Sequence, residues 1–237
     1  SLRLPKPRKG AIVCAGLSLE GDAGEWAEAA AAFATPLERA HAGRFQRAQD
    51  AALHLAGRAL ARRMLGQRPG RPLAGEFVLA PWGKPLLPPG PETEPAGPDF
   101  SIAHSGGMVW VAVCHEAPVG IDVERSAPLA DAWELAAQLH PRECAEIRSR
   151  TGPECAASFL RCWTRKEAVL KALGRGLSLA LCAFQVRTDP CGSDWLVVPP
   201  REGGCEAWTT RDIEAGPGHQ CSVAAGAGGL PLEIFLS

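Results

Sequence analysis

The chain has 237 residues, a formal net charge of −1 at pH 7 and a sequence pI of about 6.6. This length accommodates one large domain or two small ones with a real hydrophobic core. The near-neutral charge provides no chain-wide basic field for nucleic acid, and no segment approaches the ~20 consecutive apolar residues of a membrane span. We therefore expect no nucleic-acid partner, no membrane association and a cytoplasmic location.

The nine cysteines occur at scattered spacings, without a CxxC pair. Cys14, Cys114 and Cys162 lie within apolar runs, where a free cysteine behaves as a small hydrophobic residue. The sequence thus predicts reduced, structural thiols, which agrees with a cytoplasmic location. We expect no zinc site.

The first half of the chain predicts one strand, three helices and a second strand, in that order. The strands are the apolar runs 11–18 and 77–80, and the helices are 25–33, a helix that opens at Thr35-Pro36, and 44–65. Within the longest helix, Leu53, Leu60 and Met64 belong to one buried stripe. Residues 87–98 are rich in Pro, Gly and acidic residues, which predicts a loop.

The second half predicts a hairpin, then helices, then short strands. The hairpin consists of an apolar strand over 108–114 and a returning strand over 119–124, with 115–118 as the turn. The later patterns are helices over 129–139, 141–150 and 156–173, followed by strands over 184–187, 195–198, 205–210 and 220–225. Both halves therefore place a long helix beside a small antiparallel sheet, which predicts the α+β class and a structural repeat. We expect the junction near residues 115–120, with 1–117 as an N-terminal α+β half and 118–237 as a C-terminal one.

Two acidic residues share one face of the strand 119–124. Because side chains alternate along a strand, Asp122 and Glu124 point away from the side of their apolar neighbours. Their carboxylates lie ~7 Å apart and repel each other unless a cation lies between them, and hard oxygen ligands suit Mg²⁺. The alternative is a strand end that enters solvent with both acids hydrated.

The helix 156–173 carries charges inside its apolar face. On a helical projection, Lys166 and Glu167 fall within the apolar arc, and Lys171 lies at its rim beside Glu167. The opposite, solvent-facing side is predicted to hold Arg161, Arg165 and Ala168. Charges in an apolar arc are costly unless they are paired or bind a metal. We interpret Glu167 as a third acidic ligand and the two lysines as phosphate-facing, with a structural Lys–Glu pair as the alternative.

His104 and Lys84 are weaker candidates when each is considered alone. His104 precedes the predicted hairpin and leads into a glycine turn, which is typical of a loop histidine with satisfied hydrogen bonds. Lys84 lies between two turn residues, where a lysine is usually exposed. The sequence contains no GxSxG nucleophile elbow, and no spacing supports a hydrolase triad.

These segments together resemble the surfactin-synthetase-activating type of 4′-phosphopantetheinyl transferase. Two signatures carry the resemblance: VGIDVE at 119–124 and WTRKEAVLK at 163–171. The motifs GKP at 83–85 and FSIAHS at 100–105 stand upstream in the expected order. The DxE pattern alone is unspecific, but the ordered set of four motifs is a strong signal.

The resemblance implies two α+β halves related by a pseudo-twofold axis, with the active site in the cleft between them, in a monomeric protein. It implies Mg²⁺-dependent transfer of the 4′-phosphopantetheine arm of coenzyme A to a serine hydroxyl of an apo acyl carrier or peptidyl carrier protein. Adenosine 3′,5′-bisphosphate would be released. Whether the acceptor serves fatty-acid or nonribosomal peptide synthesis is not readable from the sequence.

The resemblance also assigns roles to residues. Asp122, Glu124 and Glu167 would hold Mg²⁺. The pyrophosphate would be contacted by Lys166, Lys171 and His104, and Lys84 would lie near the adenine nucleotide. A carboxylate or a metal-bound water must take the proton of the acceptor serine, and we favour Glu167 over Glu124. The catalytic candidates are thus Glu167, Lys171 and His104.

One segment departs from the family pattern. Relatives often have two lysines in an early helix that bind the ribose 3′-phosphate, but the corresponding segment here has Glu38 and His41 at these places. The cations available for this phosphate are Arg39, Arg44 and Arg47, and His41 would serve if protonated, so the sequence leaves open which of them hold it. We name Arg44 and His41 as the candidates for contact with coenzyme A.

Two other function classes are possible on the sequence alone. The same carboxylates could serve a metal-dependent hydrolase that splits a nucleotide pyrophosphate, although the acid-rich helix typical of such enzymes is not found. A non-catalytic module that binds coenzyme A or a carrier would have lost metal ligands, and all three are present. Carrier docking is predicted at a basic rim with an apolar anchor, formed by Arg142, Arg148, Arg150 and Arg161 with Leu129 and Trp133.

Overall fold

The computed structural model describes residues 7–66, 75–88, 97–126, 135–190, 194–197, 207–226 and 228–237. The chain divides into two compact units: unit 1 consists of Ser1–Glu116 and Leu230–Ser237, and unit 2 of Ala117–Gly229. Each unit packs helices on a four-stranded sheet, so the fold is a mixed one of the α+β class, as predicted. Among the described helices, none combines the length and the apolar composition that a membrane span requires.

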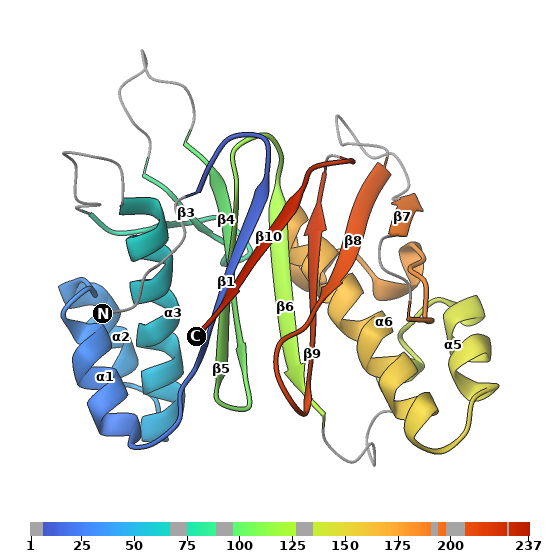
Figure 1. The fold of residues 1–237 in the computed structure, drawn as a ribbon, viewed down its shortest axis with the longest axis horizontal. Coiled ribbons are helices and arrows are strands. Elements are labelled where there is room, and N and C mark those ends of the chain that lie inside the picture. The colour runs from blue at the N-terminus through green and yellow to red at the C-terminus, as the bar shows by residue number, and fades with distance from the viewer. Residues whose placement is uncertain are drawn as a thin grey trace. The chain divides into compact units, whose positions relative to one another are not determined.

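Unit 1 contains a four-stranded sheet whose helices all lie on one side of it (Figure 1). Its elements are β1 (Ile12–Ser18), α1 (Ala23–Ala31), α2 (Pro36–Ala42), α3 (Ala48–Gly66), β2 (Val78–Leu79), β3 (Pro85–Leu86), β4 (Asp99–Ser105), β5 (Met108–Cys114) and β10 (Leu232–Leu236). The strand order is β10-β1-β5-β4, and β2 and β3 form a separate two-stranded ribbon. β10 runs parallel to β1, and the other neighbours in the sheet are antiparallel.

The last strand of this sheet comes from the C-terminal end of the chain. β10 pairs with β1 from Leu232, opposite Ile12, to Leu236, opposite Gly16. The sequence pattern predicts no strand there, and these residues were expected to belong to the C-terminal half. Because of this pairing, residues 230–237 make their contacts in unit 1. The pseudo-twofold relation between the halves stays a prediction.

The helix predicted to open at Thr35-Pro36 begins where the sequence indicates. Thr35 Oγ1 accepts a hydrogen bond from the Glu38 amide at 3.2 Å, and Glu38 Oε2 accepts one from the Thr35 amide at 2.9 Å. This capping box satisfies two backbone donors at the start of α2. Glu38 also forms a buried ion pair with Arg62, at 3.0 Å, which ties α2 to α3.

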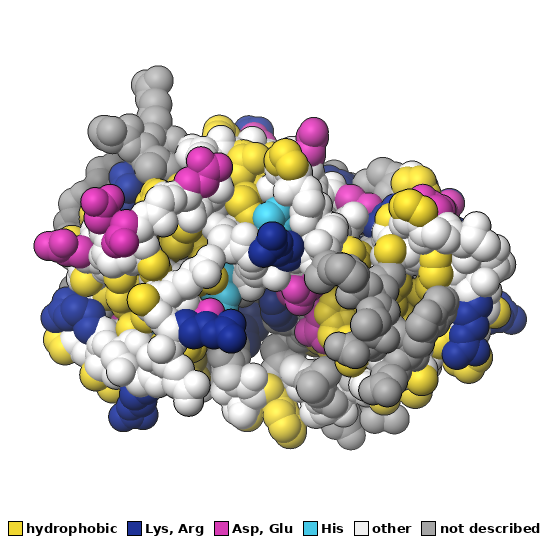
Figure 2. All heavy atoms as spheres, turned by 90° about the horizontal axis from the view of Figure 1, so that it is seen from below, with side chains coloured by type: hydrophobic (Ala, Val, Ile, Leu, Met, Phe, Trp, Pro, Cys, Tyr) yellow, Lys and Arg dark blue, Asp and Glu magenta, His cyan; other side chains and the backbone are white. Residues whose placement is uncertain are grey.

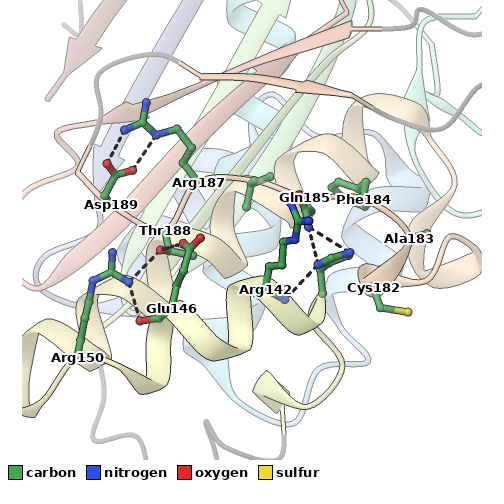
Figure 3. A pocket seen from close by; sticks show the side chains of 12 residues that line it. Arg142, Glu146, Arg150, Cys182, Ala183, Phe184, Gln185, Arg187, Thr188 and Asp189 are labelled. Carbon is green, nitrogen blue, oxygen red and sulfur yellow. Dashed lines mark hydrogen bonds and ion pairs between the residues drawn. The ribbon is translucent and has the colours of Figure 1, made fainter.

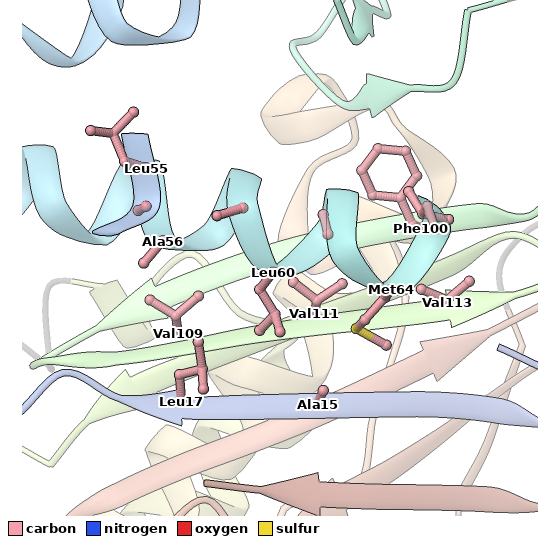
Figure 4. Packing of buried hydrophobic residues seen from close by; sticks show 14 of the residues in the cluster. Ala15, Leu17, Leu55, Ala56, Leu60, Met64, Phe100, Val109, Val111 and Val113 are labelled. Carbon is pink, nitrogen blue, oxygen red and sulfur yellow. The ribbon is translucent and has the colours of Figure 1, made fainter. Parts of the chain in front are cut away.

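The core of unit 1 lies between α3 and the sheet (Figure 4). The predicted stripe of α3, which includes Leu60 and Met64, packs on Val109, Val111 and Val113 of β5. All three valines are fully buried. Because complete burial of such a side chain stabilises a fold by ~1.5–3 kcal/mol, this contact is a main source of the unit's stability.

The hairpin predicted between 108–114 and 119–124 is wrong. β5 pairs with β1 and β4, whereas the later strand, β6, pairs with β9 of unit 2. The hairpin of this region joins β4 to β5, and its turn residues Gly106 and Gly107 have φ angles of 57° and 92°. Two central residues with positive φ are typical of tight hairpin turns and favour glycine. His104 therefore lies on a strand and not in a loop.

Unit 2 contains the second four-stranded sheet, with strand order β6-β9-β8-β7 and antiparallel neighbours. Its elements are β6 (Val119–Arg125), α5 (Pro141–Arg148), α6 (Gly152–Leu173), the 3-10 helices η1 (Gly176–Ser178) and η2 (Leu181–Ala183), β7 (Asp194–Val197), β8 (Ala207–Ile213) and β9 (His219–Ala225). The long helix α6 packs on β6 and β9. Its buried Phe159, Val169 and Leu170 form a core with Trp208 of β8 and Ala224 of β9.

Two expectations for unit 2 are wrong. Residues 184–187 form no strand, because side chains satisfy their backbone: the Val186 amide donates to Glu143, and the Arg187 carbonyl accepts from Arg165. The side of α6 that was predicted to face solvent is covered by two neighbours. Residues 187 and 188 accept hydrogen bonds from Arg165 and Arg161, and β6 packs against Ala168 at Gly120. Arg161, Arg165 and Ala168 are accordingly only 8 %, 0 % and 0 % exposed.

The surface of unit 1 is chemically mixed. On the face seen in Figure 2, Lys and Arg side chains (dark blue) are separated by hydrophobic (yellow) and acidic (magenta) side chains. Exposed large hydrophobic residues of this unit include Phe33 on the segment after α1 and Leu37 on α2. This mixture agrees with the near-neutral net charge of the chain.

Candidate active site

The acidic candidates lie where β6 meets α6 in unit 2. The two elements approach so closely at Gly120 that a Cβ atom there would lie 1.9 Å from the Ala168 carbonyl oxygen and 2.4 Å from the Ala172 amide nitrogen. Only glycine fits this contact. Because side chains alternate along β6, the face that carries Gly120 also carries Asp122 and Glu124. Both carboxylates are therefore on the face that α6 covers.

Asp122 forms an ion pair with Lys171 of α6. Lys171 Nζ lies 2.6 Å from Asp122 Oδ1, and the side chains are 32 % and 6 % exposed, respectively. Asp122 Oδ2 is buried and accepts no hydrogen bond from the described residues. Burial raises the pKa of the Asp122 carboxyl, although Lys171 opposes this shift. A buried carboxylate oxygen without a partner is costly, so this atom is a candidate acceptor for a cation.

Glu167 and Glu124 add two further carboxylates. Burial raises the pKa of the half-buried Glu167 carboxyl, and the charges of Asp122 and Glu124 raise it further. Burial lowers the pKa of the Lys171 amine, but the charges of Asp122, Glu167 and Glu124 outweigh burial and raise it above its ordinary value. Groups that shift one another's pKa lie within electrostatic range. The structure therefore brings together three carboxylates and one ammonium group predicted from separate motifs.

The donor chemistry of this group fits Mg²⁺. Carboxylate oxygens are the ligands that Mg²⁺ prefers, and three carboxylates outweigh the charge of the Lys171 ammonium. In the part of the chain that the structure describes, no three acidic, His or Cys side chains form a ready-made metal site, and Lys171 occupies one oxygen of Asp122. Coordination by Asp122, Glu124 and Glu167 thus stays a prediction, which the unpaired oxygen and the excess negative charge support.

The two lysines of α6 have different surroundings. Lys171 faces the carboxylates, whereas Lys166, also predicted to contact pyrophosphate, is 0 % exposed. Its Nζ lies 2.9 Å from Glu143 of α5, a carboxylate that is itself 2 % exposed. The sequence alternative of a structural Lys–Glu pair is thus realised for Lys166, with a partner from another helix.

Lys84 lies in unit 1 and forms an ion pair. Its Nζ is 2.5 Å from Asp99 Oδ2, and its side chain is 9 % exposed. Burial lowers the pKa of the Lys84 amine, and Asp99 opposes this shift. The expectation that a lysine between turn residues is exposed is wrong here, because Asp99 compensates its burial. Its place near the adenine nucleotide stays a prediction.

His104 belongs to a group of imidazoles in unit 1 that the sequence did not indicate. His41 and Phe45 stack around His54, with ring centroids 4.9 and 5.5 Å from the His54 ring. Burial lowers the pKa of His54 to about 4, and the charges of Arg58, His41 and His104 contribute to the shift. His54 Nε2 is buried without a partner among the described residues. The sequence did not predict a role for His54, because it belongs to no motif and lies beside the apolar stripe of α3.

Arg44, the other residue predicted for the 3′-phosphate, is exposed just after α2. Its backbone amide donates to the His41 carbonyl at 3.0 Å. The two residues assigned to this phosphate therefore lie within one turn of chain, beside the imidazole group. Both are cations or can become cations, which suits an anionic ligand.

A groove of about 890 Å³ lies elsewhere in unit 2, between α5 and the segment after η2 (Figure 3). Several of its polar groups are paired within the groove: Arg187 with Asp189 at 2.5 Å, and Arg150 with Thr188 at 2.9 Å. None of the three acidic candidates lines it. Of the predicted docking residues, Arg142 and Arg150 line the groove, Arg148 is exposed on α5 and Arg161 is buried. Leu129 and Trp133 lie outside the described residues.

The groups of the site in unit 2 suit a phosphate-linked substrate. Phosphoryl transfer requires charge neutralisation and proton removal. The site offers carboxylates that suit a divalent cation, a lysine beside them and a carboxyl with a raised pKa. The site alone does not identify the group transferred, and comparison with known proteins does.

The family model of the 4′-phosphopantetheinyl transferase superfamily matches residues 118–224, which include all three carboxylates. The 4′-phosphopantetheinyl transferase Sfp of Bacillus subtilis is 29 % identical over 206 residues, covering 86 % of this chain and 87 % of the relative. The 4′-phosphopantetheinyl transferase HetI of a Nostoc species is 31 % identical over 195 residues, covering 81 % and 78 %. The chain belongs to the 4′-phosphopantetheinyl transferase superfamily, to the Sfp type within it, and is an enzyme of this class.

Proposed function

We propose that this protein transfers the 4′-phosphopantetheine arm of coenzyme A to a serine hydroxyl of an apo acyl carrier or peptidyl carrier protein. The reaction would depend on Mg²⁺ and release adenosine 3′,5′-bisphosphate. The observation that supports this proposal most is the buried Asp122: one oxygen is paired with Lys171 and the other has no partner among the described residues. A buried carboxylate oxygen without a partner is stabilised when it binds a cation, here beside an anionic substrate.

The metal would be held by Asp122, Glu124 and Glu167. When bound, Mg²⁺ supplies charge neutralisation to the phosphate oxygens of the donor. Lys171 and His104 would contact the pyrophosphate. The surrounding carboxylates raise the pKa of the Lys171 amine and so keep it protonated. Lys166 was predicted to contact the same pyrophosphate, but its Nζ is buried 2.9 Å from the Glu143 carboxylate, so we do not propose it as a ligand.

The transfer step requires one proton acceptor. The serine oxygen would form a bond to the phosphorus of the phosphopantetheine group, and the bond from that phosphorus to the adenosine-side bridging oxygen would break. The leaving group takes the electron pair as adenosine 3′,5′-bisphosphate, and Glu167 would take the serine proton. A carboxylate within hydrogen-bond reach of the serine hydroxyl is suited to this role.

The nucleotide end of coenzyme A would be bound by residues of unit 1. Arg44 and His41 would contact the ribose 3′-phosphate, and Lys84 would lie near the adenine nucleotide. The adjacent His54, whose Nε2 has no partner within the described ranges, would donate a hydrogen bond to an oxygen of this phosphate.

A mass measurement on an apo carrier tests this function. Incubation with coenzyme A, Mg²⁺ and the enzyme should add the mass of one phosphopantetheine arm to the carrier, and Asp122→Asn should abolish the shift. Glu28→Gln, which changes an exposed carboxylate of α1, is the matched control and should behave as the wild type. Absence of the shift with every acyl and peptidyl carrier offered would reject the proposal. Release of adenosine bisphosphate at the same rate without any carrier would indicate the pyrophosphate hydrolase instead.

We also propose a monomer in the cytoplasm. The cysteines of the described ranges, among them Cys14, Cys114 and Cys162, are free thiols, as expected in a reducing compartment. Kinetics on a panel of fatty-acid and peptide-synthetase carriers would identify the natural acceptor.

A further inference from the structure

The ammonium group of Lys166 has a complete set of partners inside unit 2. It lies 2.9 Å from Glu143 Oε2 and donates to the carbonyl oxygens of Leu181, at 2.7 Å, and Phe184, at 2.5 Å. A lysine ammonium has three donors, so these three acceptors use all of them. The ammonium also lies 4.2 Å from the centre of the Phe184 ring, a favourable cation–π distance.

Glu143, the partner of Lys166, connects three parts of the unit. Its Oε2 accepts the His140 amide at 3.0 Å, as the N3 residue of the α5 capping box, and its Oε1 accepts the Val186 amide at 2.6 Å. The ion pair therefore joins α5, α6 and the segment after η2 at one buried point. Because both charges are almost fully buried, each depends on the other for compensation.

The cations of α6 together hold the segment 181–188. Lys166 binds its first carbonyl groups, Arg165 donates to the Arg187 carbonyl at 2.8 Å, and Arg161 donates to the Thr188 carbonyl at 3.2 Å. This arrangement explains why the segment does not form the predicted strand. Its backbone acceptors are satisfied by helix side chains and not by a neighbouring strand.

We propose that Lys166 is a positioning residue that fixes the orientation of α6, and that it does not contact coenzyme A. This inference rests on the proposed function. Consecutive helical residues point ~100° apart, so the direction of Lys166 determines the directions of Glu167 and Lys171. Lys166 holds α6 from the side of α5, and the close contact at Gly120 holds it against β6. For Lys166 to reach a phosphate, the Glu143 carboxylate would have to remain buried without its cation, which is strongly unfavourable.

A double-mutant cycle with Glu143 separates positioning from substrate contact. Lys166→Met leaves the Glu143 charge buried, so we expect a lower unfolding midpoint and a kcat lower by about 10- to 100-fold, since small displacements of catalytic groups have effects of this size. The KM for coenzyme A should stay within about threefold of the wild type. Adding Glu143→Gln removes the uncompensated charge, so K166M/E143Q should recover most of the midpoint and at least about tenfold in kcat.

Lys171→Met on the same helix is the matched control. It removes the ammonium beside Asp122, and Glu143→Gln should not restore activity to it, because Lys171 and Glu143 are not partners. Recovery in K166M/E143Q without recovery in K171M/E143Q is the pattern that positioning predicts. A K166M/E143Q variant that regains stability but stays as inactive as K166M, with a KM for coenzyme A at least about tenfold higher, would overturn the proposal.

Glu143→Gln alone extends the test if Lys166→Met does not fold. Positioning through the ion pair predicts that this buried change lowers kcat at an unchanged KM for coenzyme A, whereas direct contact by Lys166 predicts wild-type kcat. The wild-type enzyme serves as the control for the proposed function. If it modifies no carrier, the transferase proposal fails by itself, and the stability arm of the cycle still reports whether Lys166 and Glu143 are coupled.

Discussion

Lys166 and Glu167 are neighbours on α6, but the structure places them in opposite kinds of environment. Lys166 is fully buried and its ammonium has all of its partners. Glu167 is half-buried and joins a group in which a buried oxygen of Asp122 has no partner among the described residues. The first arrangement is complete without a ligand. The second has excess negative charge, and a cation would complete it. A charge in an apolar arc is therefore a site candidate only when its partners within the protein do not satisfy it.

The largest effect should come from the unsatisfied group. Asp122→Asn and Glu167→Gln should each reduce transfer to a carrier by at least about 100- to 1,000-fold, because each removes a charge required in the transition state. Their unfolding midpoints should not fall much, since the raised pKa of each carboxyl shows that its charge is not stabilised by the fold. Steady-state kinetics with thermal unfolding checks both. Near-normal turnover of either variant would show that the group around Asp122 and Glu167 is no more important for transfer than the satisfied Lys166 pair.

The next effect concerns the contact that sets α6 against β6. Gly120→Ala should destabilise the protein by about 1–3 kcal/mol, because the new methyl group overlaps the backbone of Ala168 and Ala172. Activity should fall with it, since Lys171 moves relative to Asp122. Gly43→Ala is the control: the nearest atom to its Cβ would be 3.6 Å away, and a change within about 0.5 kcal/mol is expected. Equal stability of both variants in chemical denaturation would contradict the close contact.

A smaller effect is expected from pH through His54. Burial lowers the pKa of His54 in the folded protein to about 4, against 6.5 ordinarily. Between these values the unfolded chain binds a proton that the folded protein does not, so stability is lost as pH falls from 6.5 towards 4. Because His54 is only half-buried, we expect its share to be about 1–2 kcal/mol. The His54→Gln variant should lack this share when both proteins are denatured at pH 6.5 and 4.5. An unchanged pH dependence would show that the imidazole group does not destabilise the charged form.

The smallest effect should come from the nucleotide end. Arg44→Gln and His41→Gln should raise the KM for coenzyme A by about 3- to 10-fold with little change in kcat, because they remove binding that is the same in ground and transition states. Dephospho-coenzyme A, which lacks the 3′-phosphate, provides the control substrate. With it, the variants and the wild type should have the same KM. A penalty of equal size with both substrates would place these residues elsewhere on the donor.

The sequence was sufficient for the parts of the molecule that depend on local patterns. The cap at Thr35, the stripe of α3 and the long helix α6 follow from residue spacing, and so does the face shared by Asp122 and Glu124. The DxE pair and the later Glu167 are brought together by the packing of α6 on β6, which the ordered motifs indicated. These are contacts between elements that each carry a clear periodic signal.

Other parts depend on partners distant in sequence. The direction of Lys166 is decided by Glu143, whose own spacing is typical of a helix cap and gives no sign of an ion pair. The segment 184–187 has the composition of a strand, but Arg165 and Glu143 take its backbone groups. β10 is identified only by its pairing with β1. His54 was not predicted, since only tertiary packing shows that its Nε2 is buried without a partner in the described part of the chain.

If the carboxylates of β6 and α6 hold Mg²⁺, calorimetric titration of Mg²⁺ in the presence of coenzyme A will detect the binding. We expect the wild type and the Glu28→Gln control to bind Mg²⁺ alike, and Asp122→Asn and Glu167→Gln to lose this binding while they stay folded. Equal binding by Asp122→Asn and the wild type would contradict this expectation.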